Sequence, residues 1–227
     1  MQQRERQLIP ACEARVELRV VNSRFIATVA PAFTVEAARA FVEQMRAEFA
    51  DASHNVPAFV IGHGRSVYAH CSDDGEPSGT AGRPALAVLQ GSGLGDAVIV
   101  VTRYFGGTKL GIGGLVRAYG DAVREVLRVL PLAEKVATQT VMVAMPYSLY
   151  ERVKLLVEAQ GGQMVDEAFA ADVTLAVRLP VETVETFRAG LQELSAGRVG
   201  AEVVEVDDET IMPIGQVGGD VLILSEA

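Results

Sequence analysis

The chain has little cysteine and no apolar segment long enough to cross a bilayer. Cys12 and Cys71 are the two cysteines among 227 residues. They are too few for a disulfide framework and lack the paired spacing of a structural zinc site, so inert or buried thiols are expected. Apolar runs fall short of the roughly 18 residues that a membrane-spanning helix needs, and the first residues are charged where a signal peptide is apolar. We expect a cytoplasmic protein without a membrane segment.

Familiar hydrolytic motifs are also missing. No serine stands in a Gly-x-Ser-x-Gly pattern, and no His-Glu-x-x-His pattern occurs. His63 lies in a glycine-flanked turn and should be exposed, whereas His54 and His70 could face a cleft or could bind backbone groups in ordinary turns. We assign no catalytic residue, and the sequence favours a binding protein over an enzyme.

Positive charge is scarce, above all in the C-terminal part. The formal net charge of −9 argues against a general nucleic-acid binder, because sequence-independent affinity comes mainly from Lys and Arg that neutralise phosphates. Residues 1–135 carry 15 Lys and Arg against 14 Asp and Glu, whereas residues 136–227 carry 5 against 15. A nucleic-acid surface should therefore lie on the first part.

The chain does contain enough apolar residues for two modest domains, and the first is expected over residues 1–135. Thr34 can cap a helix whose apolar residues share one face, namely Ala38, Phe41, Val42, Met45 and Phe49. Two more helices are expected at about 84–90 and 115–129. Strands are expected at 16–21, 25–29, 57–61, 66–71 and 97–101.

The second domain is expected over residues 136–210. Its pattern reads strand, helix, strand, strand, helix, strand at 136–145, 147–160, 162–169, 172–179, 181–194 and 199–206. That βαββαβ order is the ferredoxin-like split unit. Residues 211–227 are expected to form a tail with one more strand at Val221–Leu224.

A glycine-rich segment at 103–114 is the first candidate site. It joins a buried strand to a helix, where main-chain amides and the positive helix end can bind an anion. Arg103, Lys109 and Arg117 supply positive charge suited to phosphate, and glycines that allow close approach stand at Gly106, Gly107, Gly111, Gly113 and Gly114. This is neither a Walker loop nor a dinucleotide fingerprint, since Val116 replaces the third glycine of the latter. A tightly packed turn without a ligand is the alternative.

An acidic segment at 73–82 is the second candidate, and we expect it to be an exposed loop. Asp73, Asp74 and Glu76 could hold Mg²⁺ through carboxylates and water, but they lack the alternating ligands of an EF-hand. A solvated turn or a helix cap is the alternative, so we assign no metal or cofactor. Ser78 and Thr80 belong to the same loop.

The two segments carry opposite charge and could neutralise each other if they fold side by side. We hypothesise that they line one cleft, that a carboxylate holds Arg103, and that Lys109 or Arg117 is left to meet a partner. His54, Tyr104 and Tyr119 are candidates for the same cleft.

Both segments also resemble the signature of a known family. The runs 73–84, DDGEPSGTAGRP, and 103–119, RYFGGTKLGIGGLVRAY, together with residues 23–27 and 53–55, are similar to the YigZ/IMPACT family over about residues 20–130. The resemblance implies an α+β protein. Its N-terminal domain should be like the second domain of ribosomal protein S5, and its ferredoxin-like domain like the last domain of elongation factor G.

The resemblance also implies a function. Eukaryotic relatives regulate translation initiation under amino-acid stress by competing for a kinase activator, and fold similarity suggests nucleic-acid or ribosome binding for bacterial members. We therefore expect a translation-associated factor that contacts RNA, the ribosome or a translation-related protein. The alternatives are a Mg²⁺-dependent enzyme acting on a phosphorylated small molecule and a pure protein-interaction regulator.

Overall fold

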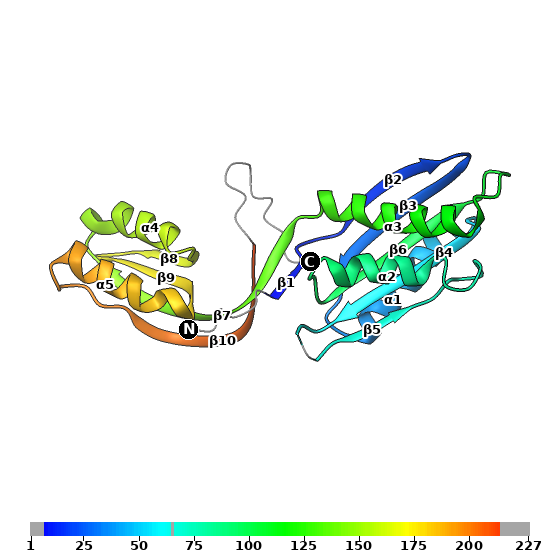
Figure 1. Cartoon of the computed structure of the whole chain (residues 1–227). Helices are drawn as coiled ribbons and strands as arrows, with labels where there is room; N and C mark the ends of the chain where they lie inside the picture. Colours follow the sequence, from blue (N-terminus) through cyan, green and yellow to red (C-terminus); the bar gives the residue numbers. More distant parts are fainter. Residues whose placement is uncertain (1–6, 65, 214–227) are drawn as a thin grey trace. The chain divides into compact units, whose positions relative to one another are not determined.

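The structure is a computed structural model that describes residues 7–64 and 66–213 (Figure 1). The chain divides into two compact units. The first unit comprises the described residues up to Glu134 together with Pro213, and the second unit comprises Lys135–Met212. The strand expected at Val221–Leu224 lies outside the described residues.

The first unit is built on a five-stranded antiparallel sheet with the order β2-β3-β6-β4-β5. The central strand is β6, whose apolar run from Ala97 to Val101 is fully buried because both faces of the sheet are covered. The strands are β2 (Ala14–Val20), β3 (Ser23–Pro31), β4 (His54–Ile61), β5 (Tyr68–Cys71) and β6 (Ala97–Tyr104).

Helices cover the two faces of this sheet unequally (Figure 1). Helix α1 (Val35–Glu48) packs Ala38, Val42 and Met45 on one face, and the hydroxyl of Thr34 accepts the Ala37 N–H as the sequence predicts. Helices α2 (Gly82–Gly91) and α3 (Gly111–Val129) pack together on the other face and close the larger core.

A short strand at the beginning of the described chain was not predicted. Strand β1 (Gln7–Pro10) pairs with the long strand β7 (Leu132–Met145). The Ala11 N–H donates to the Pro131 carbonyl and the Gly95 N–H to the Leu8 carbonyl. Only four residues long and ending in proline, β1 shows no alternation that would indicate a strand.

The second unit has the predicted βαββαβ order. After β7, it contains α4 (Tyr150–Ala159), β8 (Gln163–Phe169), β9 (Val173–Pro180), α5 (Val184–Ser195) and β10 (Glu202–Pro213). The helices α4 and α5 begin after short 3₁₀ turns at Tyr147–Leu149 and Val181–Thr183. The strand order β10-β7-β9-β8 is that of a ferredoxin-like sheet. One face packs on α4 and α5 around Phe187, Leu175 and Val143.

The structure confirms the α+β class and corrects several boundaries. Strand β10 continues to Pro213, beyond the predicted end at 206 and into the segment expected to be a tail. Helix α3 begins at Gly111, four residues before the predicted start. No helix within the described residues combines the length and apolar character needed to span a membrane.

Candidate functional site

The acidic loop, residues 72–81 between β5 and α2, is folded around Asp73. Its carboxylate accepts the N–H groups of Gly79 at 2.7 Å, Ala81 at 3.0 Å and Gly82 at 2.9 Å. Burial alone would raise the pKa of Asp73, but these three donors and nearby Arg83 outweigh it and lower that pKa. Asp73 thus caps α2 and orders its own loop.

Asp74 ties the loop to two neighbouring elements. One carboxylate oxygen accepts Arg46 of α1 at 3.0 Å, and the other accepts the backbone N–H of Asn55 in β4 at 2.6 Å. The Asp74 carbonyl lies 2.8 Å from Nδ1 of His54. A carbonyl can only accept, so Nδ1 carries the proton and Nε2 of His54 faces the other way.

Glu76 is the centre of a buried polar network. Its side chain is 4% exposed, and Oε1 accepts Nη1 of Arg103 at 2.5 Å and the hydroxyl of Tyr119 at 2.8 Å. His54 Nε2 lies 3.8 Å from the same oxygen. Burial, followed by the negative charge of Glu76, raises the pKa of Tyr119, so its hydroxyl stays protonated and donates. The network joins the acidic loop to β4, β6 and α3.

The Arg103 guanidinium is held from several sides. It lies 5.5 Å from the ring centres of Phe25 and Phe105, and Nη2 donates to the hydroxyl of Ser23 at 3.2 Å. With 5% of its surface exposed, Arg103 points inward. Removing one partner from such a buried pair leaves an uncompensated charge and costs about 3–5 kcal/mol.

The hypothesis that a carboxylate holds Arg103 is therefore confirmed, and Glu76 provides that carboxylate. One expectation needs correction. Arg103 does not stand beside Lys109 and Arg117 as a surface cation, because Glu76 and Ser23 engage it below the loop. Where the two segments meet, buried side chains fill the expected cleft.

The connection between β6 and α3 is shorter than predicted. Because α3 starts at Gly111, Gly113 and Gly114 belong to the helix and not to a loop. Gly107 and Gly111 adopt φ values of +82° and +72°, which favour glycine.

At Gly106, the connection between β6 and α3 packs closely against the β2–β3 turn. A Cβ at this position would overlap the carbonyl oxygen of Asn22 in the β2–β3 turn. The Asn22 side chain donates to the Thr108 hydroxyl at 3.1 Å, and the Gly106 N–H lies 3.4 Å from the Ser23 hydroxyl. The alternative of a tightly packed turn without a ligand therefore applies at Gly106. At Gly107, Gly111 and Gly113 the backbone is open, because an added Cβ would meet nothing within 4 Å.

The outer surface of this connection carries the remaining cations. Lys109 and Arg117 are exposed and form no ion pair or hydrogen bond with any residue that the structure describes. Phe105 and Ile112, in the same stretch of chain, are 48% and 70% exposed. We call these four residues the Lys109 surface.

The other predicted site residues have structural contacts or lie outside the network. Tyr104 donates to Asp51 at 2.7 Å, so its hydroxyl does not point toward Glu76. The Thr80 hydroxyl donates to the Pro77 carbonyl at 2.7 Å and closes a turn, and Ser78 is exposed. Among residues 7–64 and 66–213, no group of three or more His, Cys, Asp or Glu side chains could hold a metal ion.

Sequence reasoning missed Arg46 and did not single out Ser23 and Asn55 as parts of the network. Ser23 and Asn55 lie in the short segments 23–27 and 53–55 that carry the family resemblance, which was the available signal. No local pattern connects Arg46 with Asp74, 28 residues away.

Comparison with known proteins agrees with this architecture. The model of the Impact N-terminal domain matches residues 21–127, and a domain of unknown function, DUF1949, matches residues 143–198. The IMPACT family member YigZ of Escherichia coli strain K12 is 41% identical over 199 residues, which cover 87% of this chain and 98% of that protein. This chain belongs to the IMPACT family.

Solved structures also resemble this chain. A crystal structure of a hypothetical protein is 40% identical, covers 89% of this chain and 99% of its own, and has a TM-score of 0.56. The two-domain translational regulator Yih1 is 21% identical over 57% of this chain and 48% of its own. Its TM-score of 0.34 is too low to carry an argument about this chain.

Proposed function

We propose that this IMPACT-family chain is a translation-associated binding factor whose first unit contacts RNA, free or on the ribosome, through the Lys109 surface. The supporting observation is how the two loops divide their charge. All three carboxylates of the acidic loop are engaged by backbone N–H groups, by Arg46 or by Arg103, whereas Lys109 and Arg117 remain exposed without such a partner among the described residues.

The chemistry of this surface suits single-stranded RNA. Exposed Lys and Arg side chains bind phosphates, and an exposed aromatic ring such as Phe105 can stack on a base. The backbone at Gly107 and Gly111 is open to approach, since an added Cβ would meet nothing there. The acidic residues 136–227 would repel RNA, which directs it to the first unit.

Neither alternative function gains comparable support. A Mg²⁺-dependent enzyme would need free carboxylates, but Asp73, Asp74 and Glu76 are committed to the contacts described above. A pure protein-interaction regulator would bind its partner independently of RNA, so the RNA experiment separates it from our proposal.

Binding of a labelled single-stranded RNA, followed by fluorescence anisotropy over a salt series, tests the proposal. Two phosphate contacts predict a slope of log K against log salt of about −1.4, from roughly 0.7 per contact, because buried Arg103 adds none. The double variant Lys109→Gln, Arg117→Gln should bind at least tenfold more weakly and lose most of that slope.

The matched control is Arg188→Gln, Arg198→Gln in the second unit, which removes the same charge and should not weaken binding. A salt-independent affinity, or equal losses in the two double variants, would contradict RNA recognition by the Lys109 surface. Retention of a cellular protein partner after ribonuclease treatment, together with that result, would favour the protein-interaction regulator.

A further inference from the structure

The sheet face covered by α1 carries a groove of its own. It lies between α1 and the β4–β5 hairpin and has a volume of about 250 Å³. Val42, Pro57 and Phe59 form a buried apolar floor. The remaining lining side chains are polar and come from α1 and β5 or the residue after it, namely Arg39, Glu43, Arg46, His70 and Ser72.

Helix periodicity explains how α1 contributes to this groove. Arg39, Glu43 and Arg46 are four and three residues apart, so they share one side of the helix next to the inward-facing Val42. Polar side chains thus form the rim while apolar side chains form the base. Small-ligand sites commonly have this arrangement of a mostly apolar surface with a few polar groups.

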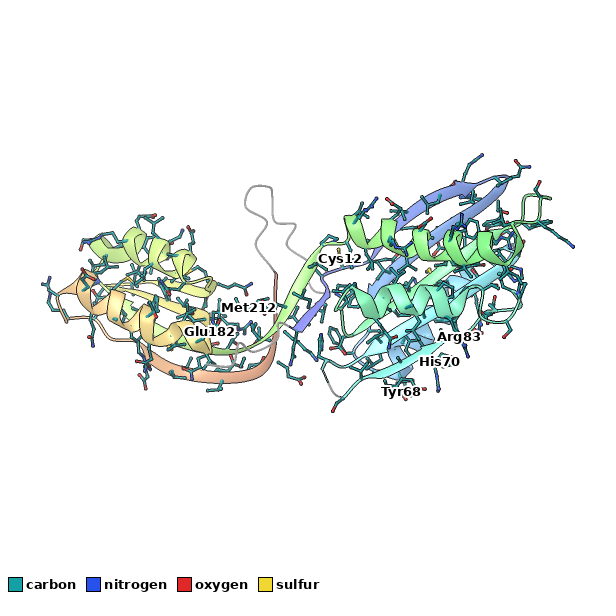
Figure 2. All side chains as sticks on the ribbon, in the orientation of Figure 1. Cys12, Tyr68, His70, Arg83, Glu182 and Met212 are labelled. Carbon is teal, nitrogen blue, oxygen red and sulfur yellow. The ribbon has the colours of Figure 1, made fainter. Side chains whose placement is uncertain are left out.

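Two of the residues that line the groove, Phe59 and His70, carry flat rings, and Tyr68 lies next to them. The ring of His70 lies 5.2 Å from that of Phe59, and Tyr68 stacks on Phe59 with ring centres 6.1 Å apart and planes inclined by 25°. Tyr68 and His70 lie along the same edge strand, β5, and both are exposed (Figure 2). A flat ring could stack on His70 without disturbing the buried core.

The charges at the rim are not evenly matched. Arg46 donates to Glu43 at 2.8 Å and to Asp74 at 3.0 Å, so neighbouring carboxylates offset its charge. Arg39 is exposed and forms no ion pair or hydrogen bond within the described part of the chain. The groove therefore has an available cation as well as flat rings in its lining.

We propose that this groove binds a small planar anion, a single aromatic or heterocyclic ring that bears a phosphate or carboxylate group. The ring lies against His70, which lines the groove, and Arg39 binds the anionic group. A space of 250 Å³ equals that of about eight water molecules, which suits one ring and not a dinucleotide. This site is separate from the Lys109 surface, because α1 and α3 pack on opposite faces of the sheet.

The test uses the full chain and amide NMR shifts with four probes. Uridine monophosphate carries a ring and a phosphate, 4-hydroxybenzoate a ring and a carboxylate, and uridine and inorganic phosphate supply one part each. At least one ring-bearing anion should shift amides of α1 and β5, with at least fivefold tighter binding than uridine or phosphate. Tighter binding of uridine monophosphate would indicate a phosphate ligand, and tighter binding of 4-hydroxybenzoate would indicate a carboxylate ligand.

Variants connect binding to the groove. Arg39→Gln, an exposed helical substitution, should weaken binding of the preferred anion five- to tenfold, and His70→Ala should weaken it by loss of the stacking surface. Arg124→Gln on α3 removes one exposed arginine from the opposite side and should leave the affinity unchanged. Unshifted core amides show that each variant is folded.

Three results would overturn the proposal: no shift with either ring-bearing anion, shifts confined to residues 105–117, or equal affinity in wild type and Arg39→Gln. None of these outcomes depends on RNA binding, so failure here would leave the function proposed for the Lys109 surface standing.

Discussion

The two units differ in where they keep their ionisable groups. The first buries Glu76, Arg103, Asp96 and Tyr119. Among the residues whose burial the structure describes, the second unit buries only Thr and Ser as polar residues and keeps its carboxylates on the surface. Both have an apolar core, but only the first also depends on charges that meet inside it.

This difference shows how the acidic loop of the first unit is held in place. The acidic loop has almost no apolar side chain to bury, so Asp73, Asp74 and Glu76 fix it through hydrogen bonds and one buried ion pair. Burying a charge is costly without its partner, so the loop has one well-defined position or loses much of its stability. The second unit needs no such device because its turns are short and its helices supply the apolar contacts.

The largest expected effect comes from removing Arg103. Arg103→Ala should lower the free energy of unfolding of the first unit by about 3–5 kcal/mol, because Glu76 loses its buried cation. Arg188→Ala in the second unit breaks an exposed pair with Glu185 and should cost at most about 0.5 kcal/mol. Hydrogen exchange of amides in β6 and β9 measures the two units separately. Equal losses of stability in the two units would contradict this difference between them.

A smaller effect is expected from adding one methyl group to a glycine. Gly106→Ala should destabilise the first unit by about 1–3 kcal/mol, because the new methyl group meets the backbone of Asn22, which cannot move aside freely. Gly190→Ala in α5 meets the flexible side chain of Leu156 and also gains helix propensity, so its effect should stay within about 1 kcal/mol.

Chemical denaturation of the two glycine variants, with Gly113→Ala as a second helical control, checks this contrast. A Cβ at Gly113 meets nothing within 4 Å, so this change should be neutral or slightly stabilising. A Gly106→Ala protein as stable as wild type would show that the loop does not rest on the β2–β3 turn.

The smallest expected effect concerns acid. The folded state lowers the pKa of Asp73, so the stability that this group contributes is present above its unfolded pKa of about 3.9 and is lost as pH falls through the folded pKa. At neutral pH, Asp73→Ala should cost about 0.5–2 kcal/mol, as expected for removal of a helix cap. The difference from wild type should shrink as the pH drops below about 4.

Urea denaturation at pH 7 and at pH 3 measures this change. Asp172→Ala, in the exposed β8–β9 turn of the second unit, serves as the matched control and should show no comparable dependence. A constant difference between Asp73→Ala and wild type at both pH values would contradict the capping role.

Much of the fold follows from local patterns, and the exceptions share a cause. The α1 stripe and the βαββαβ order were predictable because their apolar residues recur at helix and strand spacing. β1 and the last residues of β10 were missed because pairing with a distant strand forms them. The glycines at the start of α3 suggested a loop because glycine disfavours helix, yet the helix begins at Gly111 and includes Gly113 and Gly114.

The candidate site was likewise predictable only in part. Opposite charges on two segments predicted that a carboxylate would hold Arg103, but nothing in the sequence selects Glu76 over Asp74. That choice depends on Asp74 turning outward to Arg46 with a φ of +45°, which aligns Glu76 with β6 and α3. The sequence also does not identify the partner of the Lys109 surface, because exposed cations recognise charge and not a particular nucleotide sequence.

The hydrogen bond between Tyr119 and Glu76 also provides an optical signal. The chain has no tryptophan and five tyrosines, so tyrosine dominates its near-ultraviolet absorption. In an alkaline titration, the ionisation of Tyr119 should be delayed until its surroundings open, because its pKa is raised by burial and by the adjacent carboxylate. The pKa values of Tyr104 and Tyr150 are raised as well, so the part of the late tyrosinate absorbance that Tyr119→Phe removes would report the opening of the first unit without an added label.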